Sequence, residues 1–243
     1  MKNKLALSLF YAIFLLLSAC QQEIAKDDYF PLQKGLKWHY QVTQSLIDKE
    51  DFIFDYHVEN TGKISRDEHY PNDDIYVRHT SDGTDYFFIK DDVASYRVAK
   101  RTIVEQTPRF DEALRQIIPS AQAIEVDSSW TNDTKAYLIY TIPAHIMRKD
   151  IGNNLSMLFQ IMAKDETVTV PAGTFKHCIK IVGTAEFSFV ADAAQGYKTV
   201  LVTQTEWYAP SIGLVKLERD EDLNQAIFKG GKQKYELVTF GSE

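Results

Sequence analysis

Apolar side chains alternate with polar ones along most of the chain, and this period of two is the feature that most constrains the fold. In the first long stretch, Trp38, Tyr40 and Val42 alternate with His39 and Gln41. Successive side chains of a strand point to opposite faces of a sheet, so this alternation is typical of half-buried strands. The same pattern, broken by turn residues, predicts further strands at 52–58, 75–80, 86–89, 93–98, 136–142, 155–170, 175–190, 197–208, 214–219 and 232–240.

The alternation fails between residues 104 and 125. There Leu114, Ile117 and Ile118 recur at helical spacing between two prolines, so we predict one short helix over Phe110–Ile118. The short turns that separate the other segments favour antiparallel neighbours. The sequence therefore predicts a mainly β, antiparallel fold with one short helix.

Residues 1–19 have the layout of an export signal. Two lysines precede an apolar run from Leu5 to Leu17, which ends at small residues. The run matches the roughly 7–15 apolar residues of a cleaved signal and is shorter than the roughly 20 that a membrane-spanning helix needs. We therefore predict a signal peptide rather than a transmembrane anchor.

The four residues Leu17-Ser18-Ala19-Cys20 resemble the lipobox at which bacterial lipoprotein precursors are modified and cut. The resemblance implies that Cys20 receives a diacylglyceryl group and becomes the first mature residue, with a further acyl chain such as palmitate on its amine. Two or more chains give a stable anchor. An ordinary signal peptide with an incidental cysteine is the alternative. Gln21 stands where the family's inner-membrane retention signal usually has Asp, which favours the outer membrane, facing the periplasm.

The exported part is acidic. Loss of two lysines with the signal leaves 25 basic against 34 acidic residues, a net charge of −9. Nucleic-acid binders carry a basic footprint and polybasic segments attract anionic lipid, so composition argues against both partners. With Cys20 lipidated, Cys178 is the one remaining thiol, and its neighbours Ile179 and Ile181 indicate a buried, unreactive side chain.

Three motifs resemble a broad group of uncharacterised bacterial secreted proteins and lipoproteins. They are Tyr29-Phe30-Pro31-Leu32 with Gly35 and Trp38-His39-Tyr40, Val170-Pro171-Ala172-Gly173-Thr174-Phe175, and Trp207-Tyr208-Ala209-Pro210 with Gly213-Leu214-Val215-Lys216. The resemblance implies a curved antiparallel sheet or half-barrel, similar to those that carry lipoproteins and other acylated cargo across the periplasm. It brings no catalytic residues. Read physically, the glycines and prolines are turn residues between strands.

No motif predicts catalysis, a metal or a cofactor. The six histidines form no HExxH or HxH pair, and the chain lacks a GxSxG elbow, an SxxK motif and a glycine-rich phosphate loop. Asp220, Asp222 and Asn224 begin like a calcium loop, but Gln225 and Gly231 stand at its two critical positions, which indicates a solvated acidic turn. We therefore expect no catalytic or metal-binding residues.

Aromatic side chains offer a candidate ligand site on a curved sheet. The candidate apolar face consists of Trp38, Tyr40, Phe52, Phe54, Phe159, Phe187 and Phe189. The same residues are equally consistent with a filled core. We predict a signal peptide (1–19), a lipidated tether (20–28) and a single β-rich domain (29–243). The leading hypothesis is a non-enzymatic envelope lipoprotein that binds a partner protein or an apolar ligand; a hydrolase with a non-standard site and a structural or assembly component are the alternatives.

Overall fold

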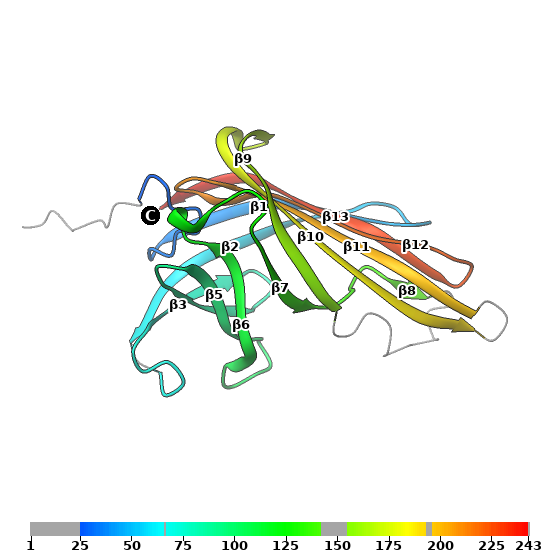
Figure 1. Cartoon of the computed structure of the whole chain (residues 1–243), viewed down its shortest axis with the longest axis horizontal. Coiled ribbons are helices and arrows are strands. Elements are labelled where there is room, and N and C mark those ends of the chain that lie inside the picture. Colours follow the sequence, from blue (N-terminus) through cyan, green and yellow to red (C-terminus); the bar gives the residue numbers. More distant parts are fainter. Residues whose placement is uncertain (1–24, 66, 142–154, 193–195, 243) are drawn as a thin grey trace, which may run out of the picture.

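A computed structural model describes residues 25–65, 67–141, 155–192 and 196–242, so Cys20 and His145 lie outside the described residues. Within these ranges the strands form one antiparallel sheet of thirteen strands (Figure 1). The strands are β1 (Leu36–Leu46), β2 (Phe52–Ser65), β3 (Asp74–Thr80), β4 (Asp85–Lys90), β5 (Ala94–Arg101), β6 (Arg109–Pro119), β7 (Ser129–Thr134), β8 (Tyr140–Thr141), β9 (Leu155–Val170), β10 (Gly173–Asp192), β11 (Gly196–Ala209), β12 (Gly213–Asn224) and β13 (Phe228–Ser242).

The sheet curls until its two edge strands meet. Its order is β6-β5-β4-β3-β2-β1-β13-β12-β11-β10-β9-β7, with β8 paired to the start of β13. Trp130 Nε1 and Asn132 Nδ2 on β7 both donate to the Gln116 carbonyl on β6, at 3.1 and 2.7 Å. These two bonds join β7 to β6, the strands at the two ends of the strand order. The predicted mainly β, curved antiparallel sheet is confirmed as a nearly closed half-barrel.

The predicted helix at Phe110–Ile118 is wrong, because these residues form β6. Their register against β5 jumps, so that Ala99 pairs with Phe110 while Arg97 pairs with Arg115. A bulge of this kind shifts the phase of the alternation and places apolar residues three and four apart without a helix. A 3₁₀ turn (Ala121–Ala123) follows the strand. Within the described residues, no helix is long and apolar enough to cross a membrane.

Register decides which side chains face the inside of the curl. One rung across the sheet joins Phe54 of β2, Val42 of β1, Tyr235 of β13, Leu217 of β12 and Glu206 of β11. Directly paired residues lie on the same face of a sheet, so all five point to the concave side. The concave face is therefore apolar toward β2 and polar toward β11.

Close packing on the concave face explains one glycine of β10. Phe159 of β9 lies over Gly183, and a Cβ added there would come within 2.7 Å of its ring. On the other side, the Phe159 ring stacks on Trp130 with centroids 5.9 Å apart. The ring thus fills the space above the glycine, and a side chain at position 183 would displace it.

Two further segments cover parts of the concave face. The N-terminal segment (Tyr29–Gln33) packs against β3 and β4 at one end. The segment Lys135–Ile139, called the crossing segment below, runs over β11 and β12. Of the strand predicted at 136–142, Tyr140–Thr141 alone is observed, as β8, while residue 142 lies outside the described residues.

Candidate functional site

A chain of hydrogen bonds crosses the polar half of the concave face. The Tyr208 hydroxyl donates to Glu206 Oε2 at 2.7 Å, and the Gln204 amide donates to the other oxygen of that carboxylate. Arg219 Nη1 donates to Gln204 Oε1 at 2.9 Å, and Arg219 Nε donates to Glu221 Oε1 at 2.8 Å. Glu206, Arg219 and Glu221 are buried. Arg219 and Glu221 form a buried ion pair, and the Glu206 carboxyl is satisfied by hydrogen bonds from neutral side chains, the two ways in which buried ionisable groups are tolerated.

This network fixes the crossing segment to the sheet. The two oxygens of Glu221 accept the backbone N–H groups of Tyr137 at 3.0 Å and Leu138 at 2.8 Å. Arg219 Nη2 donates to the Lys135 carbonyl at 2.7 Å. Irregular backbone that lies over a sheet needs partners for its polar groups, and one ion pair supplies three of them. The network therefore acts as a latch for the crossing segment.

Burial raises the pKa of the Glu206 carboxyl above its usual range, although hydrogen bonds from Tyr208 and Gln204 and the charges of Arg115 and Arg219 oppose the shift. A carboxyl with a raised pKa favours its protonated form in the folded state. Its contribution to stability is therefore complete below the ordinary pKa of about 4.5 and is lost as the pH rises through the raised value.

Glu206→Gln removes this titration. We expect the free energy of unfolding of the variant to increase steadily relative to that of the unmodified protein as the pH rises from about 4.5 to neutrality, because the variant lacks the stability that the unmodified protein loses. Urea denaturation at a series of pH values measures the difference. The control is Glu112→Gln, which removes an exposed carboxyl on β6 and is expected to show a flat difference. An equally flat difference for Glu206→Gln would contradict the prediction.

Five of the seven aromatic residues nominated from the sequence pack in the core. Trp38, Tyr40, Phe159 and Phe189 are buried, and Phe187 is half-buried against the same cluster as Phe189. Trp38 Nε1 donates to the Ile212 carbonyl and the Tyr40 hydroxyl to the Leu214 carbonyl, each at 2.8 Å. These bonds and contacts hold the side chains in fixed positions within the sheet's packing.

The remaining two nominated residues lie on an open part of the concave face. Phe52 is 62% exposed, and its ring centroid lies 5.3 Å from that of the half-buried Phe54. On the same face, Tyr56 meets Tyr235 edge to face at 5.7 Å. We call Phe52, Phe54, Tyr56 and Tyr235 the aromatic strip. Alternation along β2 could have found Tyr56, but Tyr235 joins it only through the pairing of β13 with β1.

Tyrosine hydroxyls at the centre of the concave face have few partners. In the part of the chain that the structure describes, neither Tyr86 nor Tyr235 has a hydrogen-bond partner for its hydroxyl. Burial raises the pKa of Tyr235 to about 12, and the neighbouring Tyr86 adds to the shift. Both phenols are therefore neutral donors at physiological pH, available to a ligand or to water.

Arg78 closes the opposite end of the concave face. Its guanidinium lies over the rings of Phe30 at 4.4 Å and Trp38 at 4.6 Å. It donates to Asn60 Oδ1 at 2.8 Å and to the Pro31 carbonyl at 3.0 Å. Burial lowers its pKa to about 10. The Tyr-Phe-Pro-Leu motif thus forms a plug that this arginine holds in place.

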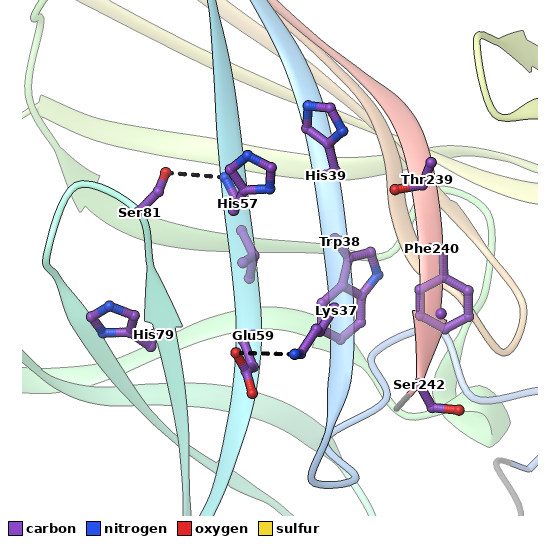
Figure 2. Close-up of a pocket in the computed structure, with 12 residues that line it drawn as sticks. Lys37, Trp38, His39, His57, Glu59, His79, Ser81, Thr239, Phe240 and Ser242 are labelled. Atoms are coloured by element: carbon purple, nitrogen blue, oxygen red, sulfur yellow. Dashed lines mark hydrogen bonds and ion pairs between the residues drawn. The ribbon is translucent and has the colours of Figure 1, made fainter.

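Three histidines lie together where β13, β1, β2 and β3 border a groove of about 450 Å³ (Figure 2). The rings of His39 and His57 stack with centroids 4.5 Å apart. His39 is hydrogen-bonded to Asp55, and His79 to Asp85, each at 2.7 Å. Among the described histidines, no ring nitrogen has a hydroxyl or thiol as its hydrogen-bond partner.

The other candidate chemical groups also have structural partners. Asp220, Asp222 and Asn224 lie within β12, so the predicted acidic turn is wrong; Asp220 pairs with Lys232 at 2.8 Å. Cys178 is a buried free thiol, and burial raises its pKa to about 11. Within the described residues, no group of three His, Cys, Asp or Glu side chains is arranged to hold a metal ion.

Comparison with known proteins gives a partial match. Residues 119–226 match the DUF3108-like family model. The DUF3108-like segment runs from the end of β6 to the end of β12 and contains the whole Glu206–Arg219–Glu221 network with the crossing segment. No curated protein matches the sequence.

Two crystal structures align with almost the whole chain. One is a protein from Bacteroides fragilis NCTC 9343, described as exported and of YmcC-like fold. It is 15% identical, with 88% of this chain and 98% of that chain covered and a TM-score of 0.37. The other is a protein from Parabacteroides distasonis ATCC 8503, described as a lipoprotein. It is also 15% identical, with 90% and 100% covered and a TM-score of 0.37.

Proposed function

We propose that the protein is a non-enzymatic lipoprotein of the bacterial envelope that binds the apolar part of a ligand on the aromatic strip. The lipid on Cys20 attaches it to a membrane, and Gln21 favours the outer membrane with the domain in the periplasm. The lipobox and the motifs that resemble secreted lipoproteins support this placement. The ligand site is the aromatic strip rather than the full set of seven aromatics.

The observation that carries the proposal is that, among the described residues, the strip is an exposed aromatic part of a concave face on which two segments cover other parts. The N-terminal plug covers the β3–β4 end, and the crossing segment covers β11 and β12. Phe52 remains 62% exposed on that face, with Phe54 and Tyr56 half-buried beside it. An exposed aromatic surface next to unpartnered phenol hydroxyls suits a ligand with an apolar body and a polar end.

The buried charged groups of the concave face favour binding over catalysis. Glu221 and Arg219 are occupied by the crossing segment, and Glu206 by Tyr208 and Gln204. Each of these groups has a partner that fixes protein structure, so the network is explained by the latch that it forms.

The test uses the chain from Gln21 onward, which contains every described strand, and the fluorescent fatty acid cis-parinaric acid as the probe. We expect Phe52→Ser combined with Phe54→Ser to weaken probe binding about tenfold, because two aromatic contacts are lost. Fluorescence titration gives both dissociation constants.

Ile53→Ser is the matched control, since Ile53 lies between the two phenylalanines on the opposite face of β2 and is 57% exposed. Its binding is expected to equal that of the unmodified chain. Equal binding by the double variant and the control would reject the strip as an apolar site. If the strip crosslinked stoichiometrically to one envelope protein and did not bind the probe, the proposal of an apolar ligand would be rejected in favour of a protein partner.

A further inference from the structure

The turn between β5 and β6 presents two aliphatic side chains to solvent. Glu105 N donates to the Thr102 carbonyl at 2.9 Å, which closes a four-residue turn. Ile103 and Val104 occupy its two central positions and are 82% and 86% exposed. These are the highest exposures among the large hydrophobic side chains of the described residues. In Figure 1 this turn projects at the lower edge of the molecule.

Turn chemistry does not account for these residues. Central turn positions favour Gly, Pro, Asn and Asp, whereas β-branched aliphatic residues fit strands. The turn is nonetheless held firmly, since the Glu105 carboxylate accepts from Thr102 N at 2.8 Å and from Thr102 Oγ1 at 3.0 Å. Arg109 adds an ion pair to Glu105 at 3.5 Å. Within the described residues Ile103 lies beside Gly83 of the β3–β4 turn, yet it remains 82% exposed, and Val104 is 86% exposed. A rigid turn that exposes adjacent Ile and Val departs from the usual chemistry of turns.

Cations surround the base of this turn. Lys100, Arg101 and Arg109 flank it, against the single carboxylate of Glu105 within residues 100–109. Arg101 pairs with Asp85, but Lys100 has no ion pair among the described residues. The pKa of Lys100 is lowered by partial burial and by the neighbouring Arg109 and Arg97. The hairpin is thus locally basic in a chain whose net charge is −7.

We propose that the β5–β6 turn inserts into the surface of an anionic lipid bilayer, with Ile103 and Val104 among the acyl chains and Lys100, Arg101 and Arg109 at the phosphates. An apolar tip flanked by basic side chains is typical of a protein segment that binds at the surface of a bilayer. The composition of the whole chain does not reveal this basic turn, because acidic residues elsewhere outweigh its positive charge.

The length of the tether allows one bilayer to hold both the lipid and the turn; this step rests on the proposed lipid at Cys20. Lys90, at the start of the β4–β5 turn, pairs with Asp28, so the tether joins the domain at that end of β5. The eight residues of β5 rise about 26 Å to the opposite end. Ala25 is already bound to the domain, because its carbonyl accepts from Asp28 N and from Ser211 Oγ, each at 3.0 Å. The five steps from Cys20 to Ala25 span at most about 18 Å. The tether is shorter than the strand, so one bilayer holds both the lipid and the turn when β5 lies along the membrane surface.

The test places a tryptophan at the tip of the turn. Val104→Trp protein, purified at full mature length, is reconstituted into vesicles of phosphatidylethanolamine and phosphatidylglycerol that contain lipids brominated on the acyl chain. After the fluorescence of the unmodified protein is subtracted, we expect the emission of the added tryptophan to be quenched about twofold or more. We also expect its emission maximum to shift to the blue, because the indole enters the boundary of the acyl chains. Tyr197→Trp, at an exposed position in β11, is the control and is expected to remain unquenched.

Two further conditions of the quenching experiment test whether the basic residues contribute to membrane binding. Replacing phosphatidylglycerol by phosphatidylcholine, or raising the salt concentration, is expected to reduce the quenching, because screening weakens attraction to anionic lipid. Equal quenching of Val104→Trp and Tyr197→Trp would overturn the proposal. An unquenched Val104→Trp signal that shifts on addition of a second envelope protein would also overturn it, in favour of a protein partner.

Absence of the lipid on Cys20 gives a different experimental result from a turn that does not enter the bilayer. Protein without a lipid does not float with the vesicles in a density gradient at high salt, whereas an anchored protein with a solvent-exposed turn floats but stays unquenched. Unlipidated protein added to preformed vesicles still reports insertion of the turn through the same quenching. The two proposals are therefore separable.

Discussion

Glu221→Ala is expected to lower the free energy of unfolding by about 3–5 kcal/mol, the usual cost of breaking a buried ion pair from one side. The substitution leaves the buried Arg219 guanidinium without its carboxylate and removes the acceptor of two backbone N–H groups. Each orphaned buried donor adds its own desolvation cost. Urea denaturation measures the loss. Trypsin cleavage after Lys135 gives a second readout, because release of the crossing segment exposes that bond.

The matched control is Glu218→Ala on the same strand. Glu218 pairs with Lys216 at 2.7 Å on the opposite face, where its side chain is 47% exposed. Exposed ion pairs contribute about 0–1 kcal/mol, so a small loss is expected. The double variant Arg219→Met with Glu221→Leu should lose less than the sum of the single variants, because no unpaired charge remains. Similar losses of unfolding free energy for Glu221→Ala and Glu218→Ala would mean that the buried network contributes no more to stability than an exposed ion pair.

The sequence predicted the elements whose alternation is unbroken. Strands β9, β11 and β13 lie close to their predicted ranges, because a long strand with one buried face repeats every second residue. The prediction of strand at 214–219 stopped short, since β12 continues to Asn224. Its continuation contains the acidic residues that resemble a turn, while the buried Glu221 points to the other face.

Bulges caused the main error. In β6 the register jump beside Phe110 erased the alternation, and the remaining spacing of Leu114, Ile117 and Ile118 resembled a helix. A bulge depends on how two strands pair, and pairing is a tertiary property. No local pattern in a single strand reports it.

The candidate site was predictable in part. Phe52 and Phe54 were found because they alternate on one strand, and both lie on the open strip. Tyr235 was missed because it reaches the strip only through the β1–β13 pairing, which joins residues almost two hundred positions apart. The Arg219–Glu221 pair was missed for a related reason. Charged residues in a polar stretch usually indicate solvent, and here the crossing segment buries them.

The exposed β5–β6 turn favours contact with an anionic bilayer, whereas the acidic composition of the chain argues against it. The acidic balance of the chain argued against contact with anionic membranes, and it describes the average surface correctly. The β5–β6 turn departs from that average within ten residues. Screening limits each charge to about 10 Å at moderate salt, so a local cluster acts on a bilayer independently of distant carboxylates.

Cys20→Ala is expected to abolish incorporation of labelled palmitate completely. The thiol of Cys20 is the proposed attachment point of the diacylglyceryl group, and without it neither the thioether nor the acylated N-terminus forms. Two or more acyl chains hold a protein on a membrane because each buried methylene contributes about 0.8 kcal/mol. Metabolic labelling followed by gel fluorography measures incorporation, and mass spectrometry of the N-terminal peptide locates the acyl groups.

Cys178→Ala provides the matched control, because Cys178 is the one other cysteine of the chain and its thiol is buried in the sheet. Its palmitate label is expected to equal that of the unmodified protein. Label that persists in Cys20→Ala, or a mature N-terminus at another residue, would contradict lipidation at the lipobox. The tether from the bilayer to Ala25 would then no longer support contact of the β5–β6 turn with the same membrane, and vesicle quenching of the turn alone would decide that contact.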